Sequence, residues 1–223
     1  KILFSQFAKN APYAAYLEMD DFVICSASPE LFFTRTGSTL TTKPMKGTLP
    51  RGLTEDQDNL HRNKLKTSEK DRAENIMVVD MIRNDLGRIA QTGSVNVEKQ
   101  LQLEKYPTLW QMTSTVTAKT DSSSAKTLSA LFPCASITGA PKAETLKIID
   151  GLETEARGIY TGSIGYIAPG GLAQFSVAIR TALLHLDSQQ LDYGVGSGIV
   201  WDSDPVLEYQ ECLLKSRAIR NPT

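Results

Sequence analysis

Lys46 lies in the segment Pro44-Met45-Lys46-Gly47-Thr48, where a primary amine could do chemistry. Gly47 allows the backbone to approach a ligand closely, and Pro44 restricts the conformations of the loop. An amine that is held in this way and partly desolvated can lose its proton near neutral pH and act as a nucleophile. A basic surface loop is the alternative interpretation, and it is the commoner one for such a segment taken alone.

Acidic side chains on two expected helices could bind a metal ion. A helix that begins near residue 204 would place Glu208, Glu211 and Lys215 on one stripe, and a second helix carries Glu74 near its start. Two helices that each present a carboxylate to one cleft would suit Mg²⁺ and an anionic ligand. Ordinary solvated pairs at i, i+4 spacing, such as Glu211 with Lys215, are the alternative.

Further side chains and loops could bind or activate a substrate. The segments 194–198 and 138–142 could cradle an anion, and the second opens onto a helix N-terminus. Arg180, at the end of an apolar strand, could grip a carboxylate through two hydrogen bonds. Glu30 could do acid–base work, and Tyr160 could contact a ligand. Each feature has a simpler alternative. The glycine run could be a tight turn, Arg180 an ordinary charge at a strand end, Glu30 a turn carboxylate and Tyr160 a buried aromatic ring.

The elements that must position these groups follow from hydrophobic periodicity and turn residues. A helix is expected from Ser68 to Leu86, with Ser68 as its cap, and others from Pro141 to Gly151 and from about residue 204. The apolar stripe of the first helix is predicted to be Ile76, Val79, Ile82 and Leu86. Strands are expected at residues 13–17, 22–25, 31–33, 163–167, 175–180 and 192–193. Strands at both ends with helices between and after them predict an α+β fold.

Composition excludes several classes of protein. The 223 residues are 41% hydrophobic and 22% charged with a net charge of −1, which argues against nucleic acid or an anionic membrane as the main partner. No stretch is long and apolar enough for a membrane span, and no signal-peptide pattern is present. Three scattered cysteines indicate a reducing, cytoplasmic compartment, and two isolated histidines argue against a zinc site. Because Lys1 already lies in a patterned segment, N-terminal sequence is expected to be missing.

Several separated motifs, in the same order, resemble the chorismate-utilising enzymes over essentially the whole chain. The motifs are Pro44–Thr48 with Arg51-Gly52, 71–75, 83–88, 136–142, 162–166, 194–200 and 208–211. The resemblance implies one catalytic domain over residues 1–223. It also implies an α+β fold in which antiparallel sheets pack as a sandwich with helices outside.

Lys46 decides which branch of that family the chain resembles. Aminodeoxychorismate synthases (component I) carry Lys at this place, whereas anthranilate synthases usually carry Ala. The resemblance implies that Lys46 attacks the chorismate ring at C2 as the C4 hydroxyl leaves, after which ammonia adds at C4 and expels the lysine. Glu30 would be the acid–base carboxylate, and the product would be 4-amino-4-deoxychorismate for para-aminobenzoate and folate. Anthranilate synthase component I and a non-catalytic chorismate-binding module remain alternatives.

The resemblance also implies a set of binding residues. Mg²⁺ would lie between Glu74 and Glu211, with Glu208 close by. The enolpyruvyl carboxylate would be held by Tyr160, Arg180, Gly196 and Gly198. Residues expected near the substrate are Thr48, Ser136, Gly139 and Lys215.

Two differences from the wider family bear on function. Gln111 stands where many relatives have a His that is linked to pyruvate loss, which fits an enzyme that retains the enolpyruvyl group. None of Cys25, Cys134 and Cys212 lies on the Gly-x-Cys-x-Gly turn of a glutaminase. The chain is therefore expected to use ammonia, delivered by a separate glutamine amidotransferase subunit, with no nucleic-acid or membrane partner.

Overall fold

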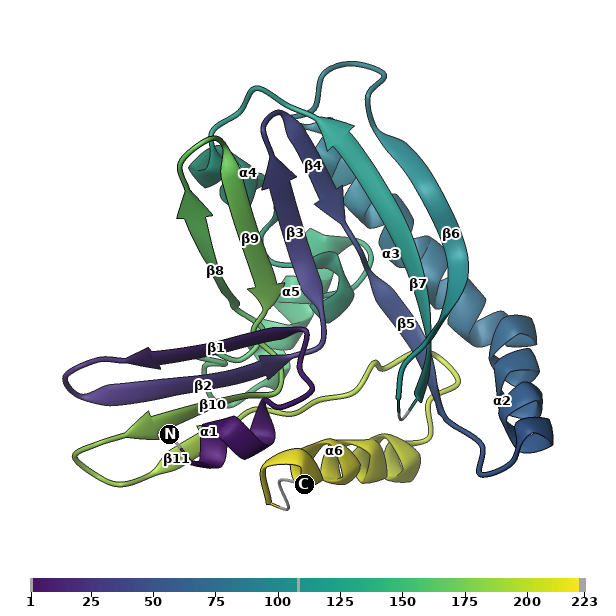
Figure 1. Cartoon of the computed structure of the whole chain (residues 1–223), viewed down its shortest axis with the longest axis vertical. Coiled ribbons are helices and arrows are strands. Elements are labelled where there is room, and N and C mark those ends of the chain that lie inside the picture. The colour runs from purple at the N-terminus through teal and green to yellow at the C-terminus, as the bar shows by residue number, and fades with distance from the viewer. Residues whose placement is uncertain (1, 108, 221–223) are drawn as a thin grey trace. The chain divides into compact units, whose positions relative to one another are not determined.

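The computed structural model describes residues 2–107 and 109–220, which form the helices and strands labelled in Figure 1. The chain divides into two compact units. Unit 1 contains residues 1–31, 155–165 and 175–223, and unit 2 contains residues 32–154 and 166–174. Strand pairs with a described register are antiparallel, which confirms the predicted α+β class with antiparallel sheets.

Unit 1 is built on a four-stranded sheet with the order β1-β2-β10-β11. Its elements are α1 (Ile2–Phe7), β1 (Tyr13–Glu18), β2 (Phe22–Ser28), β10 (Thr181–His185), β11 (Leu191–Tyr193) and α6 (Pro205–Arg220). The predicted start of α6 is confirmed, because the Asp204 carboxylate accepts hydrogen bonds from the N–H groups of Val206 and Leu207 at 2.8 and 3.0 Å.

The larger sheet has the order β5-β7-β4-β3-β9-β8, with β6 paired to β7. Its strands are β3 (Leu31–Thr36), β4 (Thr39–Thr42), β5 (Met45–Pro50), β6 (Asn96–Lys105), β7 (Leu109–Lys119), β8 (Ser163–Ala168) and β9 (Leu172–Val177). Strand β7 pairs with β6 along one edge and with β4 and β5 along the other. The sequence patterns did not predict β6 or β7, although Trp110, Met112, Val116 and Ala118 recur at the even spacing of a strand.

Helices α2 (Glu55–Thr67) and α3 (Glu69–Gly87) pack on β5 and β7 in unit 2. The unit also contains α4 (Ser124–Leu131), a short 3₁₀ turn (Ala135–Ile137) and α5 (Lys142–Leu152). Pro141 is the N-cap of α5 rather than its first residue. Ser68 caps α3 as predicted, since its hydroxyl accepts a hydrogen bond from the Asp71 N–H at 3.3 Å.

The predicted apolar stripe of α3 is wrong at one position. Val79, Ile82 and Leu86 are buried, but Ile76 is 38% exposed. Asn75 takes the inward position instead, and its carboxamide oxygen accepts a hydrogen bond from the Ser114 hydroxyl at 2.5 Å. The helical period places residues 75, 79, 82 and 86 on one face, so a polar residue with a partner on β7 displaced the apolar one from the buried face.

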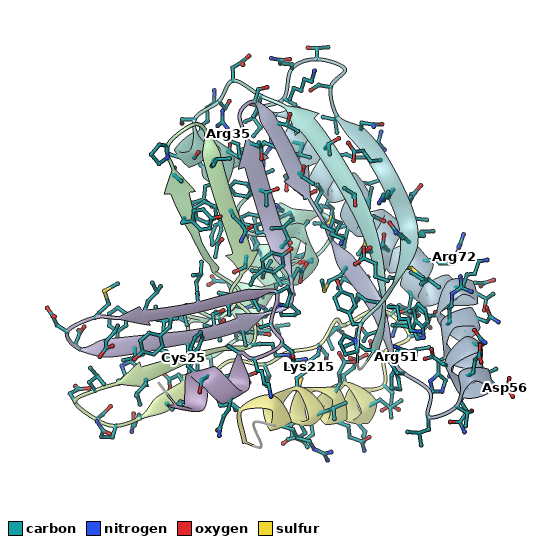
Figure 2. All side chains as sticks on the ribbon, viewed as in Figure 1. Cys25, Arg35, Arg51, Asp56, Arg72 and Lys215 are labelled. Carbon is teal, nitrogen blue, oxygen red and sulfur yellow. The ribbon has the colours of Figure 1, made fainter. Side chains whose placement is uncertain are left out.

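A core of Leu65, Trp110 and Met112 joins α2 to β7. Asp58 of α2 links the edge of this core to Arg51, with nitrogen–oxygen distances of 2.6 and 2.7 Å; Arg51 is labelled in Figure 2. The Trp110 indole N–H also donates to Asp58 at 2.9 Å. The Arg51 guanidinium holds the pKa of the Asp58 carboxyl well below its usual range, with smaller contributions from the Gly52 N–H and Trp110.

Asp58→Asn is expected to lower the free energy of unfolding of unit 2 at neutral pH, because the amide cannot replace the charge-assisted bonds to Arg51. Since the folded-state pKa is depressed, the stabilisation is fully present above the ordinary pKa of an aspartic acid, about 4, and is lost progressively as pH falls from there through the much lower folded-state pKa, so the difference should be smaller at pH 3 than at pH 7. Urea titrations of both proteins at pH 7 and pH 3 check this. A stability difference that persists unchanged at pH 3 would contradict the ionic origin.

Candidate active site

The predicted site residues are divided between the two units. Unit 2 contains Lys46, Thr48, Glu74, Ser136 and Gly139, together with Gln111. Unit 1 contains Glu30, Tyr160, Arg180, Gly196, Gly198, Glu208, Glu211 and Lys215. Each group is described separately below, and the prediction that they form one site in one catalytic domain stays a prediction.

Lys46 lies in a bulge of β5. The register pairs Met45 with Thr113 and Thr48 with Gln111, so β5 has one residue more than β7 between these two pairs. Bulges interrupt the ladder and redirect side chains, and they are common beside active sites. The Lys46 side chain is half-buried. The structure therefore places the amine on an irregular strand segment rather than in the flexible basic loop that was the alternative.

Gly47 makes this bulge possible. Its φ is +81°, and a Cβ atom there would lie 2.9 Å from side-chain atoms of Asp71 and Leu65. The left-handed conformation favours glycine, and the close approach of α2 and α3 leaves no space for a side chain. The close approach that the structure shows at Gly47 is to α2 and α3, and the expected approach to a ligand stays a prediction.

Gly47→Ala is expected to lower the free energy of unfolding by more than the roughly 1–2 kcal/mol of the left-handed conformation alone, because the new methyl group meets Leu65 and Asp71. Gly37→Ala is the matched control, since Gly37 has a φ of +60° and nothing within 4 Å of the added methyl group. Denaturant titrations of both variants check the difference. Equal losses of stability would show that the packing around Gly47 yields freely.

Gln111 contacts the bulge directly, and no sequence pattern predicted this contact. Its amide nitrogen donates to the Gly47 carbonyl at 2.9 Å, and its amide oxygen accepts from the Thr48 hydroxyl at 2.8 Å. The signal that could have found it is the strand periodicity of β7, which places Gln111 opposite Thr48. Thr48, predicted to lie near the substrate, is thus partly engaged inside unit 2.

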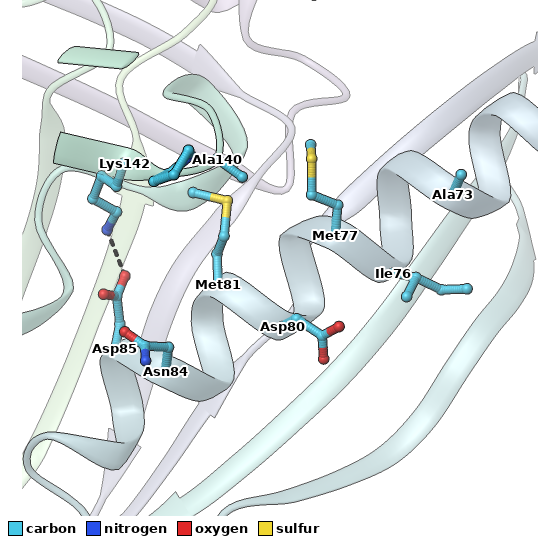
Figure 3. A pocket seen from close by; sticks show the side chains of 10 residues that line it. Ala73, Ile76, Met77, Asp80, Met81, Asn84, Asp85, Ala140 and Lys142 are labelled. Carbon is cyan, nitrogen blue, oxygen red and sulfur yellow. Dashed lines mark hydrogen bonds and ion pairs between the residues drawn. The ribbon is translucent and has the colours of Figure 1, made fainter. Parts of the chain in front are cut away.

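Glu74 lies half-buried on α3, on the helix whose outer face lines a pocket. The pocket measures about 750 Å³ and is formed by α3 and the loop before α5. Figure 3 shows Met77 and Met81 on its α3 side and Ala140 opposite them. The lining residues include Ile76, which explains why this side chain is exposed, and three residues of the candidate anion cradle, Ala140, Pro141 and Lys142. None of the described lining residues is one of the predicted catalytic, substrate-binding or metal-binding residues.

Lys142 has a structural role that the sequence left open. The segment 138–142 was a candidate anion cradle, yet the Lys142 ammonium donates to the Asp85 carboxylate (Figure 3). It also donates to the carbonyls of Leu131 and Pro133. An ammonium group has three N–H donors, so these contacts occupy all of them. Lys142 therefore anchors the loop to α3 and has no donor left for an anion.

Ser136 lies in the 3₁₀ turn and Gly139 in the loop that follows it, before α5 begins. The Ser136 hydroxyl is 3.3 Å from the Cys134 sulfur. A Cβ atom at Gly139 would lie 2.6 Å from the Thr145 side chain, so glycine permits the loop to close on the first turns of α5. The substrate-binding roles of Ser136 and Gly139 stay predictions.

In unit 1 the structure brings several predicted residues together around Lys215 of α6; the lysine itself is labelled in Figure 2. The Lys215 ammonium lies 2.5 Å from the Glu211 carboxylate and donates to the Gly196 carbonyl at 2.8 Å. The Arg180 guanidinium donates to the Lys215 carbonyl at 3.0 Å. Glu211 and Lys215 thus form the i, i+4 pair that was the alternative interpretation. Lys215 also contacts the glycine segment and Arg180.

Tyr160 packs against the glycine segment. A Cβ atom at Gly194 would lie 2.3 Å from the Tyr160 ring, and one at Gly196 would lie 2.7 Å from its hydroxyl. Glycine is therefore required for this contact, which explains the glycine run better than the tight turn that was its alternative. The neighbouring Arg180 has a φ of +51°, a strained conformation for a residue with a side chain.

Arg180 also affects a buried tyrosine. Burial raises the pKa of the Tyr193 hydroxyl, and the nearby Arg180 guanidinium partly offsets this by favouring the phenolate. The charge of Arg180 thus acts on a polar group that is largely shielded from solvent, the Tyr193 hydroxyl. This fits a guanidinium that can bind a carboxylate, the role predicted for it.

Glu30 lies in the turn between β2 and β3 and is only 5% exposed. Its N–H donates to the Ser28 hydroxyl at 3.2 Å, and its carbonyl accepts from the Val177 N–H at 3.1 Å. An ordinary turn carboxylate would be solvated, because burying a carboxylate is costly. The burial favours a functional carboxylate over the simple turn residue.

The predicted metal ligands have the chemistry that Mg²⁺ prefers, since Glu74, Glu208 and Glu211 all offer carboxylate oxygens. Glu208 accepts a hydrogen bond from the Ser203 hydroxyl at 2.7 Å, and Glu211 is paired with Lys215. Within either unit taken by itself, the described residues contain no cluster of three His, Cys, Asp or Glu side chains suited to a metal. The metal-binding role of the three glutamates stays a prediction.

Comparison with known proteins gives one family. The family model described as chorismate binding enzyme matches residues 4–221. Aminodeoxychorismate synthase component 1 of Klebsiella aerogenes is 43% identical over 95% of this chain and 47% of its own length. Anthranilate synthase component 1 1 of Haloarcula marismortui is also 43% identical, over 95% of this chain and 43% of its own length.

A solved structure agrees with these matches. Anthranilate synthase component I from Streptococcus pneumoniae superposes with a TM-score of 0.87 at 32% identity and covers 97% of this chain and 48% of its own. The chain spans 23% to 47% of the length of the curated relatives that it matches. In the part of the chain that the structure describes, no helix has the length and apolar character of a membrane span.

Proposed function

The chain belongs to the chorismate-binding enzyme family, and we propose that it is the catalytic part of an aminodeoxychorismate synthase component I. The proposed reaction converts chorismate and ammonia to 4-amino-4-deoxychorismate, in para-aminobenzoate and folate biosynthesis. The observation that carries the proposal is Lys46, which stands half-buried in a bulge of β5 whose shape depends on Gly47 and Gln111.

The residues of the chain supply a covalent route. The neutral Lys46 amine attacks C2 of the ring and the C4 hydroxyl leaves, with a proton from Glu30, as water. Ammonia then adds at C4, and the C2–nitrogen bond breaks with its electron pair returning to the Lys46 nitrogen, which restores the neutral amine. The Glu30 carboxylate takes a proton from the added nitrogen and so regains the proton that it gave. A hydroxyl is a poor leaving group without protonation, and a covalent intermediate divides one difficult displacement into two easier steps.

Binding of the substrate carboxylates would fall to the cluster around Lys215. Arg180, with Tyr160 and the Gly196–Gly198 backbone, would hold the enolpyruvyl carboxylate. Thr48, Ser136 and Gly139 would lie near the substrate. The ligands proposed for Mg²⁺ are Glu74, Glu208 and Glu211. When bound, the ion would neutralise the charge of the ring carboxylate and orient it.

Anthranilate synthase is the second candidate, because a relative with that name is as similar to the chain as one named aminodeoxychorismate synthase. Lys46 and Gln111 both speak against it. A lysine nucleophile is not needed where ammonia adds at C2 directly, and an amide side chain cannot act as the general acid or base that removal of pyruvate would use.

The proposed partner is a glutamine amidotransferase that supplies ammonia. The word component in the name of the Klebsiella aerogenes relative implies a second subunit for that protein. In the described part of this chain, the three cysteines are free thiols, in a strand, before the 3₁₀ turn and on α6. None lies on a turn of the kind that a glutaminase nucleophile occupies. A cytoplasmic location stays a prediction.

Product identification tests the proposal. The complete natural polypeptide that contains these residues is incubated with chorismate, Mg²⁺ and ammonium, and the products are separated by chromatography and identified by mass. We expect 4-amino-4-deoxychorismate without release of pyruvate. Anthranilate with stoichiometric pyruvate would establish the second candidate, and chorismate recovered unchanged would refute both.

A further inference from the structure

The side chain of Gln111 grips the Lys46 bulge at two consecutive residues. Its amide nitrogen donates to the Gly47 carbonyl at 2.9 Å, and the Thr48 hydroxyl donates to its amide oxygen at 2.8 Å. A carbonyl can only accept, so the NH₂ group must face Gly47 and the oxygen must face Thr48. The orientation of the amide is therefore determined by its partners.

These two bonds occupy a site where the sheet itself is incomplete. A bulge leaves the extra residue outside the regular ladder, and a buried carbonyl without a partner is costly. Gln111 is 7% exposed and lies opposite Thr48 on the neighbouring strand, so its amide replaces the missing ladder partner of Gly47. The bulge is thus completed by one side chain of β7.

The segment around Lys46 is held on its other side as well. The Ser114 N–H donates to the Pro44 carbonyl at 3.1 Å, two residues before Lys46. Gly47 packs against Asp71 and Leu65, which prevents the segment from moving toward the helices. The backbone is therefore held by hydrogen bonds on both sides of Lys46, at the Pro44 carbonyl and at the Gly47 carbonyl. Gln111 supplies the second of these bonds.

We propose that Gln111 is a positioning residue for Lys46. Its amide sets the geometry of the Gly47–Thr48 peptide, and hence the direction in which the Lys46 side chain projects from β5. This rests on the proposed role of Lys46 as the nucleophile. Other side chains do not reproduce the grip. A glutamate only accepts hydrogen bonds, and a neutral histidine presents its donor and its acceptor in different directions.

The test compares Gln111→Met with Gln111→Glu and with Gln102→Met, a control at an exposed position of β6 on the far edge of β7. We expect Gln111→Met to slow formation of the Lys46–chorismate adduct by about 10- to 100-fold, since small misplacements of a reacting group cost that much. The dissociation constant for chorismate should stay within about threefold. Gln111→Glu keeps the hydrogen bond from Thr48 and loses the one to Gly47. Its rate of adduct formation should therefore lie between those of the unmodified protein and of Gln111→Met.

A substrate-free measurement separates this proposal from the proposed function. Backbone amides of residues 45–49 should exchange hydrogen faster in Gln111→Met than in the unmodified protein or in Gln102→Met. Adduct formation at the unmodified rate, or unchanged exchange, would overturn the positioning role while leaving Lys46 as the nucleophile. If the unmodified protein forms no adduct at all, the proposed function fails, and the positioning role fails with it. If Gln111→Met does not fold, Gln111→Glu, which conserves volume, decides the question by the same measurements.

Discussion

Lys46→Ala is expected to abolish the covalent adduct with chorismate and to lower turnover by on the order of 1,000-fold. Alanine removes the amine and leaves the backbone of the bulge in place, since the contacts that hold it come from Gly47, Thr48 and Gln111. The adduct is sought by intact-protein mass after acid quenching during turnover, and turnover is followed by product chromatography.

Lys43→Ala is the matched control for this prediction. Lys43 lies in the same segment, and its ammonium is 2.7 Å from the Glu104 carboxylate. Its loss removes an amine and a partly exposed ion pair, but we expect the adduct to form as before. An adduct of unchanged mass increment in Lys46→Ala would refute the nucleophile role. If the adduct were lost in Lys43→Ala but not in Lys46→Ala, Lys43 rather than Lys46 would be the nucleophile.

Glu30→Gln is expected to lower kcat by about 100- to 10,000-fold, the usual contribution of a positioned acid or base. Glutamine keeps the volume of the side chain and its capacity for hydrogen bonds, but it cannot give or take a proton. Because the backbone bonds of Glu30 to Ser28 and Val177 do not involve its carboxyl group, the turn should survive the change. Steady-state kinetics over a range of pH values provide the measurement, and the pH dependence attributed to this group should disappear.

The same substitution at Glu155, an exposed residue of the same unit, serves as the control and should leave kcat within about threefold. Thermal unfolding of both variants shows whether a loss of activity reflects a loss of folded protein. A Glu30→Gln enzyme that is folded and fully active would remove Glu30 from the mechanism. Full adduct formation with slow product release would instead place Glu30 only in the second half of the reaction.

Local chemistry made part of the structure predictable. Ser68 and Asp204 begin helices because their side-chain oxygens accept the N–H groups that a helix leaves unpaired at its start. These signals depend on a few neighbouring residues, so the sequence is sufficient to read them. The Lys46 segment could be recognised for the same reason, because Pro44 restricts the backbone before the lysine and Gly47 permits conformations that other residues rarely adopt.

Other features depend on partners that are distant in the sequence. Ile76 fits an apolar stripe by its spacing, yet Asn75 is the buried residue because Ser114 on β7 supplies its hydrogen bond. Strand β7 was overlooked because it is central and buried on both faces, where polar threonines interrupt the apolar alternation. Lys142 ends the segment that was a candidate anion cradle, but Asp85 and two carbonyls accept hydrogen bonds from its ammonium group.

Residue types and short spacings were enough to predict the family, the starts of α3 and α6 and a candidate reactive amine at Lys46. The position of Lys46 in a bulge, and the hydrogen bond from the distant Gln111 to that bulge, appear only in the folded chain. The link that Lys215 makes between Glu211 and the glycine segment likewise appears only there. The physical reason is that buried polar groups must find hydrogen-bond partners, and the fold, not the local sequence, chooses which partners come within reach.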